Sequence, residues 1–150
     1  MDKPKIFIFD LDDTLYQNDA TGKLANVVNK QLFEKLDGIK LIFSNATYVH
    51  CLSWLNRLEI LPFIKAIISC DIIGGYKPDR TIYQRIMSVC NIDLAIYDIV
   101  FFDNLSCNLI PAQELGWNCV LIIPYLSKYS NEADNIFSDI NDSIIKYTQN

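Results

Sequence analysis

Three carboxylates stand within four positions of this chain, directly after a short apolar run. The run extends from Lys5 to Phe9, and the acids that follow it are Asp10, Asp12 and Asp13. So short and apolar a run predicts a strand buried on both faces, as in parallel sheets. Because a carboxylate is costly in a core, Asp10 marks the carboxyl end of the strand, where open α/β sheets bind ligands. Two carboxylates at such an edge can hold a divalent metal, and one of them can attack an electrophile.

Three further polar side chains follow the ends of later apolar runs: Ser44, Lys77 and Asp103. Parallel strands place their carboxyl ends along one edge, so residues far apart in the sequence can converge there. Together with the first acids, the set holds carboxylates, a hydroxyl and a cation. A phosphate ester repels an anionic nucleophile, and a divalent metal together with a lysine offsets that repulsion. The set is therefore suited to phosphoryl transfer.

Regular apolar spacing supplies the elements that must position these groups. Buried strands are predicted at 5–9, 40–43, 66–70, 99–102 and 119–123. Helices are predicted at 23–36, 46–58, 78–90, 105–115 and around 131–147. Alternating strands and helices predict an α/β fold with a doubly wound, Rossmann-like parallel sheet of five strands. We expect residues 1–124 to form the core domain and residues 125–150 to form a tail whose helix packs on it.

Composition limits the classes of partner. The net charge of −5, without a basic run, weighs against nucleic-acid binding, and no apolar run approaches the length of a membrane span. Five scattered cysteines without a CxxC pair predict reduced thiols and a cytoplasmic protein. Met1 to Pro4 leads directly into the first strand, so we expect no signal peptide. The oligomeric state is left open.

The polar groups resemble, in order, the four motifs of the haloacid dehalogenase-like (HAD) hydrolases. The pentad from Asp10 to Thr14 resembles motif I, and Ile42 to Ala46 resembles motif II. Lys77-Pro78 resembles motif III, and Phe101 to Asn104, followed by Asn108, resembles motif IV. A closer similarity, to the branch of pyrimidine 5′-nucleotidases, rests on the segment that runs from Ser44 through His50 to Leu58. The resemblance implies a HAD-like sheet with strand order 5-4-1-2-3, counted along the five expected strands.

The resemblance also implies roles. Asp10 would attack phosphorus to form an aspartyl-phosphate, and Asp12 would serve as general acid and base. The substrate phosphate would be bound by Ser44, Asn45 and Lys77. Mg²⁺ would be held by Asp10, Asp12 (also through its backbone carbonyl) and Asp103. Supporting roles fall to Thr14, which would orient Asp12, and to Asn104.

Two features depart from the resembled pattern. Asn104 stands where the nearest branch has a second acid, which would weaken Mg²⁺ binding and activity. The segments between Asp10 and Ser44, and between Ser44 and Lys77, are too short for an inserted cap domain. We therefore expect a capless site that is open to solvent.

The function predicted first is a Mg²⁺-dependent phosphomonoester hydrolase acting on a nucleotide or another phosphomonoester, a phosphoprotein included. The alternative is a catalytically weakened or inactive HAD-like domain that serves as a binding or regulatory module. Transfer of phosphate to another acceptor and dehalogenation are a third option, and dehalogenation has no use for Asp12 and Mg²⁺. Structural interpretations also exist: Ser44 as a helix N-cap, Lys77 as a solvated loop cation, Asp103 as a turn residue, and His50 as a packing or hydrogen-bonding residue.

Overall fold

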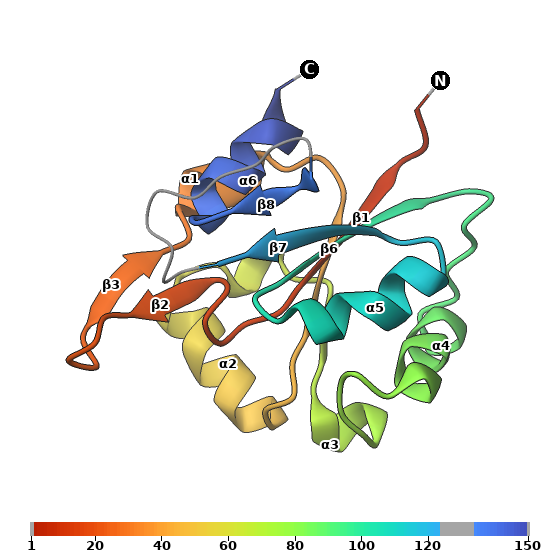
Figure 1. The fold of residues 1–150 in the computed structure, drawn as a ribbon, viewed down its shortest axis with the longest axis horizontal. Helices are drawn as coiled ribbons and strands as arrows, with labels where there is room; N and C mark the ends of the chain where they lie inside the picture. Colours follow the sequence, from red (N-terminus) through yellow and green to blue (C-terminus); the bar gives the residue numbers. More distant parts are fainter. Residues whose placement is uncertain (1, 124–133, 150) are drawn as a thin grey trace.

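The computed structural model describes residues 2–123 and 134–149, and its centre is a parallel sheet (Figure 1). Six strands lie in the order β5-β4-β1-β6-β7-β8. Their bounds, in that order, are Ala66–Ile68, Ile39–Phe43, Lys5–Phe9, Asp98–Asp103, Asn118–Ile122 and Ile136–Phe137. The predicted parallel α/β sheet is confirmed. The five-stranded prediction with order 5-4-1-2-3 is wrong in its number of strands, because β8 adds two residues at the β7 edge, a length too short to show in an apolar pattern.

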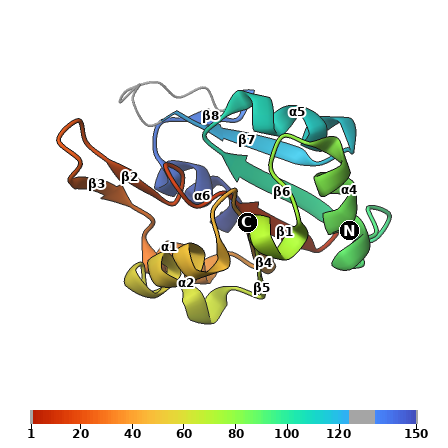
Figure 2. The ribbon, with the colours of Figure 1, turned by 90° about the horizontal axis from the view of Figure 1, so that it is seen from below.

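Helices cover both faces of the sheet, as Figure 2 shows. Along β1 the side chains alternate, so Phe7 and Phe9 face one apolar cluster while Ile6 and Ile8 face the other. The first cluster is completed by α1 (Lys30–Lys35), α2 (Tyr48–Arg57) and α6 (Ile140–Thr148), and the second by α4 (Arg80–Val89) and α5 (Ser106–Glu114). Short helical turns at α3 (Cys70–Ile73) and η1 (Leu61–Phe63) complete the described helices. With β1 buried between two helical layers, its carboxyl end is held rigidly.

The segment after β1 contains a β-hairpin that the apolar pattern does not predict. Strands β2 (Tyr16–Asn18) and β3 (Leu24–Val27) pair antiparallel and project from the body of the protein (Figure 1). The Asp19 side chain accepts hydrogen bonds from the backbone of Thr21 and Lys23 and so closes the turn. The helix predicted at 23–36 is therefore wrong over its first half, and only α1 is helical.

The last helix begins later than the sequence pattern predicts. Asp139 caps α6 by accepting a hydrogen bond from Asn141 N, and the part of the predicted helix at 131–133 lies outside the described residues. Ile140 and Ile144 are buried, and the Tyr147 ring lies 5.9 Å from that of Phe7. None of the helices in the described ranges has the length and apolarity needed to cross a bilayer.

Candidate active site

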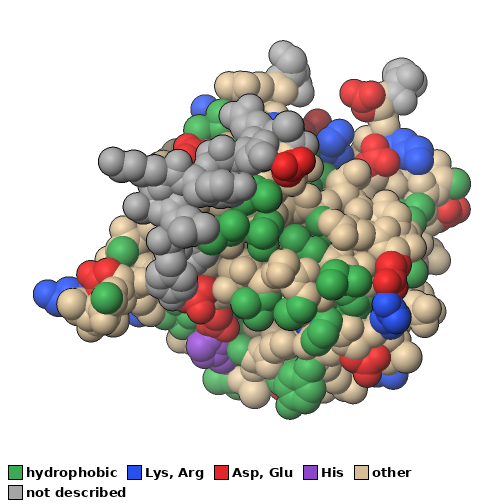
Figure 3. Space-filling model, in the orientation of Figure 1, with side chains coloured by type: hydrophobic (Ala, Val, Ile, Leu, Met, Phe, Trp, Pro, Cys, Tyr) green, Lys and Arg blue, Asp and Glu red, His purple; other side chains and the backbone are tan. Residues whose placement is uncertain are grey.

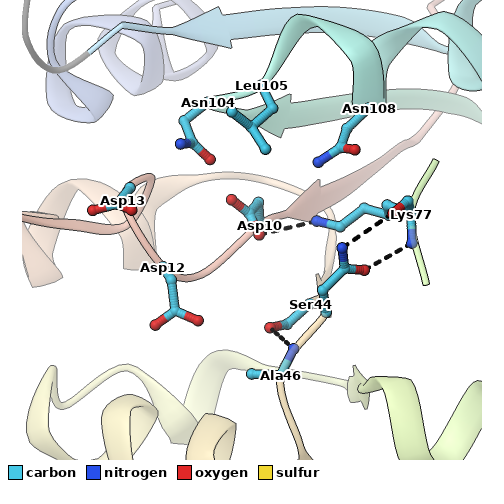
Figure 4. Close-up of a pocket in the computed structure, with 10 residues that line it drawn as sticks. Asp10, Asp12, Asp13, Ser44, Ala46, Lys77, Asn104, Leu105 and Asn108 are labelled. Carbon is cyan, nitrogen blue, oxygen red and sulfur yellow. Dashed lines mark hydrogen bonds and ion pairs between the residues drawn. The ribbon is translucent and has the colours of Figure 1, made fainter. Parts of the chain in front are cut away.

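Side chains from separate strand ends meet at the carboxyl edge of the sheet. The backbone hydrogen bonds of the sheet continue one residue past β1 and β4, from Asp10 N to Phe102 O and from Ser44 N to Ile68 O. These bonds fix Asp10 and Ser44 just beyond the ends of their strands. A cavity of about 190 Å³ opens there (Figure 4). It is lined by Asp10, Asp12, Asp13, Ser44, Asn45, Ala46, Lys77, Asn104, Leu105 and Asn108. Thr14 and Asp103, the remaining predicted site residues, are fully buried and contact these groups.

A buried lysine joins two of the acids. Lys77 Nζ donates hydrogen bonds to Asp10 Oδ1 at 2.9 Å, Asp103 Oδ2 at 2.8 Å and the Phe43 carbonyl at 2.8 Å. Its side chain is only 1% exposed, so the interpretation as a solvated loop cation is wrong. A buried ammonium needs such partners, because an unpaired charge in the interior is very costly.

Asn45 fixes the backbone of the lysine loop. Its side-chain oxygen accepts a hydrogen bond from Lys77 N at 2.7 Å, and its amide donates to the Lys77 carbonyl at 3.1 Å. A Cβ added at Gly75, two residues before Lys77, would lie 2.4 Å from Ile82 Cδ1, so a larger residue there would displace the buried Ile82 side chain. The Asn45 amide thus holds Lys77 in place, and its binding of phosphate stays a prediction.

Asp103 is held from its own strand end. Its Oδ1 accepts a hydrogen bond from Leu105 N at 2.9 Å, and the Asn108 amide lies 3.2 Å from both carboxylate oxygens. The sequence places Asn108 in motif IV without a role, and the structure shows that it orients this carboxylate. Its spacing of five residues from the acid, on the helix that follows, is the signal that could have revealed this contact.

Thr14 contacts the first acid instead of the second. Its hydroxyl lies 2.9 Å from Asp10 Oδ2 and 3.4 Å from Asn104 Oδ1. The prediction that Thr14 orients Asp12 is therefore wrong. The backbone turns after the strand, with Asp13 at φ 63°, and this turn brings the hydroxyl back toward Asp10.

Ser44 makes a local hydrogen bond. Its Oγ accepts from Ala46 N at 3.0 Å, and only 2% of the residue is exposed. The interpretation of Ser44 as the helix N-cap is wrong, because Thr47 caps α2 by accepting from His50 N at 3.4 Å. Ser44 therefore lies in the cavity wall, in the turn that precedes the helix.

Two buried carboxylates share one ammonium, and this arrangement shifts the pKa values of Asp10 and Lys77. Burial, together with the nearby Asp103 carboxylate, outweighs the lowering effect of Lys77 and raises the pKa of Asp10 to about 6. Burial alone would lower the pKa of Lys77, but the two carboxylates outweigh it and the pKa of Lys77 is raised. Lys77 is therefore charged, and Asp10 is ionised only above about pH 6.

We expect the Asp10→Asn variant, kept metal-free with a chelator, to be more thermostable than the wild type near pH 7.5 but not near pH 4. The folded-state pKa of Asp10, about 6, exceeds its ordinary value of 3.8. The Asp10 carboxyl therefore contributes its full stabilisation at a pH below 3.8, its pKa in the unfolded chain. That contribution is lost as the pH rises through about 6, its pKa in the folded protein. Asparagine does not ionise and escapes that loss. Thermal unfolding of both proteins at the two pH values measures the difference; equal stability near neutral pH would contradict it.

The Asp12 carboxylate is directed away from Asp10 (Figure 4). Its Oδ1 lies 2.7 Å from His50 Nε2 and also accepts a hydrogen bond from the Tyr16 hydroxyl. Within residues 2–123 and 134–149, no three His, Cys, Asp or Glu side chains form a metal-binding group. A site built on the three side chains of Asp10, Asp12 and Asp103 is thus not formed.

The donors that remain still suit Mg²⁺. This ion is bound in many phosphoryl-transfer sites by one or two carboxylates together with phosphate oxygens and water. Asp10 lines the cavity, and Asp103, which is fully buried, is joined to Asp10 through Lys77. With the Asp12 backbone carbonyl, they provide hard oxygen donors only, which fit this metal and not a thiolate-seeking one.

Comparisons with known proteins show which solved structures share the fold of this chain. No family model matches the sequence, and no curated protein matches it. Among solved structures, a HAD family enzyme from Bacteroides thetaiotaomicron in complex with magnesium and inorganic phosphate has a TM-score of 0.62 at 14% identity, over 79% of this chain and 94% of that one. A predicted HAD-like hydrolase from Porphyromonas gingivalis has a TM-score of 0.60 at 14% identity, over 80% and 91% of the two chains.

A dehalogenase is also similar, with a TM-score of 0.64 at 20% identity over 81% of this chain. The present chain spans 55% of that protein's length. These likenesses establish that the chain has a HAD-like fold. None of these three structures is named as a nucleotidase, so the predicted similarity to pyrimidine 5′-nucleotidases stays a prediction.

Proposed function

We propose that this protein is a Mg²⁺-dependent phosphomonoester hydrolase that acts through an aspartyl-phosphate at Asp10. The observation that supports this most is the buried Asp10–Lys77–Asp103 arrangement, of which Asp10 and Lys77 line a cavity at the carboxyl edge of the sheet. A fixed cation beside a carboxylate allows that carboxylate to approach an anionic phosphate. The magnesium and phosphate bound to the Bacteroides enzyme are consistent with this chemistry.

The residues divide the reaction into two steps. In the first, an Asp10 oxygen forms a bond to phosphorus while the bond to the leaving oxygen breaks, and Asp12 transfers a proton to that oxygen. In the second, Asp12 takes a proton from water, which attacks phosphorus and releases phosphate and the free Asp10 carboxylate. Lys77, with Ser44 and Asn45 at the cavity wall, would contact the phosphoryl oxygens. Asp10 is ionised above about pH 6 and is available as a nucleophile near neutral pH.

The metal would be held by Asp10, Asp103 and the backbone carbonyl of Asp12. Bound there, Mg²⁺ would offset the charge of the phosphate and of the two carboxylates. The Lys77 ammonium already neutralises part of that charge, and Asn108 and the Leu105 amide keep Asp103 oriented. Thr14 keeps one Asp10 oxygen directed away from Lys77.

The size of the cavity bears on the substrate. A cavity of about 190 Å³ accommodates a phosphoryl group and little more. Between Asp10 and the core strand β4, which leads to Ser44, the chain forms only the β2–β3 hairpin and α1, and no inserted domain. We infer that the site is capless and that the rest of the substrate lies outside it. Nucleotides, other small phosphomonoesters and phosphoproteins all fit this description, and small ones would show high KM because little of them is contacted.

A hydrolysis assay tests the proposed function. Purified protein with Mg²⁺ is expected to release phosphate from p-nitrophenyl phosphate and from a panel of nucleoside monophosphates, sugar phosphates and phosphopeptides. A chelator should abolish the release and added Mg²⁺ should restore it. No phosphate release from any substrate, or full activity in chelator, would contradict the proposal. Chloride release from 2-chloropropionate without phosphatase activity would favour a dehalogenase.

One observation favours the alternative of a weakened, regulatory domain. Asn104 lines the cavity but is neutral, so the site has one carboxylate fewer than the resembled motif. Asn104→Asp is expected to bind Mg²⁺ more tightly, because it adds an anionic oxygen beside Asp10 and Asp103. Titration calorimetry of the wild type and the variant measures this, with Asn118→Asp, a β7 residue outside the cavity, as the matched control. Equal affinity in all three proteins would remove Asn104 from the metal's surroundings.

A further inference from the structure

The acid–base residue of the proposed reaction is held by two side chains that belong to different elements. Asp12 Oδ1 accepts a hydrogen bond from the Tyr16 hydroxyl, at the start of the hairpin, and lies 2.7 Å from His50 Nε2, in the first turn of α2. Within the part of the chain that the structure describes, Oδ2 has no hydrogen-bond partner. One oxygen of the carboxylate is thus fixed and the other is available.

Tyr16 is itself rigidly placed. It is 6% exposed, and its ring stacks on Trp54 with centroids 3.6 Å apart and planes 7° from parallel. The Arg57 guanidinium lies over the Trp54 ring at 4.5 Å. Burial and the nearby Asp12 raise the pKa of the Tyr16 hydroxyl, so it stays protonated and donates to the carboxylate.

His50 is the single histidine of the chain, and Figure 3 shows it at the surface close to acidic side chains. Its side chain is 40% exposed, and that of Asp12 is 37% exposed. A lone hydrogen bond at such exposure would position a carboxylate weakly. Two donors that converge on one oxygen from separate elements restrict it far more, because both the hairpin and α2 would have to move to release it.

We propose that His50 and Tyr16 are positioning residues that hold Asp12 by Oδ1, so that Oδ2 exchanges the proton with the leaving oxygen and then with water. This rests on the proposed function, since it assigns Asp12 its acid–base role. The backbone bridge between Asp12 and Tyr16 ties the hairpin to the same turn. The β2–β3 hairpin would thus contribute to catalysis through Asp12, without contacting the phosphoryl group.

The test compares leaving groups. Nitrophenolate leaves from phosphorus without protonation, whereas an alkoxide requires a proton. We expect His50→Ala and Tyr16→Phe to lower kcat/KM for glycerol 3-phosphate by about tenfold or more, within the range of general acid catalysis. The loss with p-nitrophenyl phosphate should be much smaller. The quantity kcat/KM is used because it reports the step in which the leaving group departs.

Three variants separate positioning from a general effect on folding. His50→Gln returns a side-chain N–H to nearly the same place and is expected to recover most of the glycerol 3-phosphate activity. Tyr16→Phe keeps the ring that stacks on Trp54 and removes only the hydroxyl. Val49→Ala changes the neighbouring, 75% exposed residue of α2 and should leave both substrates unaffected. Equal losses on both substrates, or none, would overturn the positioning role.

The contact can also be observed without substrate. Because the chain has one histidine, imidazole ¹⁵N NMR gives an unambiguous signal. We expect hydrogen on Nε2, with a shift that changes in Asp12→Asn. A neutral ring with hydrogen only on Nδ1 would overturn the contact. If the wild type shows the expected NMR signal but has no phosphatase activity, the proposed function is overturned, and with it the catalytic part of this proposal. If the wild type is active but His50→Ala and Tyr16→Phe lose the same activity on both substrates, only the positioning role is overturned.

Discussion

Replacing Asp10 by asparagine is expected to lower kcat for phosphate-ester hydrolysis by about three orders of magnitude or more, as loss of a catalytic nucleophile does. Asp10 stands at the end of β1, with Oδ1 on Lys77 and Oδ2 on Thr14. The asparagine oxygen can accept from Lys77, and its amide can donate to the Thr14 hydroxyl, so the change removes the nucleophile with little rearrangement. The measurement is steady-state hydrolysis of p-nitrophenyl phosphate with saturating Mg²⁺.

The matched control for this variant is Asp98→Asn. Asp98 begins β6 at the opposite edge of the same sheet, where its only ion pair among the described residues is a surface contact of 3.8 Å to Lys3. It undergoes the same chemical change and should keep wild-type activity. An Asp10→Asn protein that is folded and hydrolyses at a rate close to that of this control would rule out Asp10 as the nucleophile.

Replacing Lys77 by methionine should have a large effect on both activity and stability. The Asp10 and Asp103 carboxylates would then face each other in the interior without a cation. Breaking a buried ion pair in this way costs about 3–5 kcal/mol. Uptake of a proton by Asp10, whose pKa is already raised to about 6, would relieve part of this cost at acidic pH. The free energy of unfolding, measured in urea with a chelator at neutral pH, is the appropriate quantity.

A second substitution makes this prediction specific. Adding Asp10→Asn to Lys77→Met removes one of the two opposed carboxylates and should recover much of the lost stability, although not the activity. The remaining acid, Asp103, keeps its hydrogen bonds from Asn108 and the Leu105 backbone. Lys65→Met, a lysine that is exposed next to β5, serves as the control. If the double variant is no more stable than Lys77→Met, repulsion between the two carboxylates is not the cause of the loss.

The core strands were predictable because each one is marked by a short apolar run in its own segment of the sequence. Strands β1, β4 and β6 are short apolar runs with both faces buried, and a polar residue stands where each run ends. Strands β5 and β7 lie nearer the edges of the sheet and are only partly buried, and β5 ends at Ile68, two residues before the predicted end at 70. The position of Asp10 could be inferred in this way, because a carboxylate after Phe9 cannot remain in the core. The same reasoning placed Ser44 and Asp103 at the same edge.

The hairpin was missed because its apolar spacing imitates a helix. Leu24, Val27 and Val28 are three and four positions apart, yet only Val28 is buried, at 4% exposure, while Leu24 and Val27 are 41% and 38% exposed. The turn around Asp19 and Gly22, where φ is 82°, decides the local structure instead. Strand β8 was missed because two residues carry no pattern.

By itself, the sequence determined the order of strands and helices along the core and the residue types at the sheet edge, because burial imposes these position by position. Only the tertiary structure decided which groups touch. Lys77 lies between Asp10 and Asp103 because Asn45 holds its loop, and Asp12 turns to His50 and Tyr16 because the hairpin and α2 meet beside it. These contacts join residues up to 67 positions apart. Their geometry depends on packing between elements, which no local pattern records.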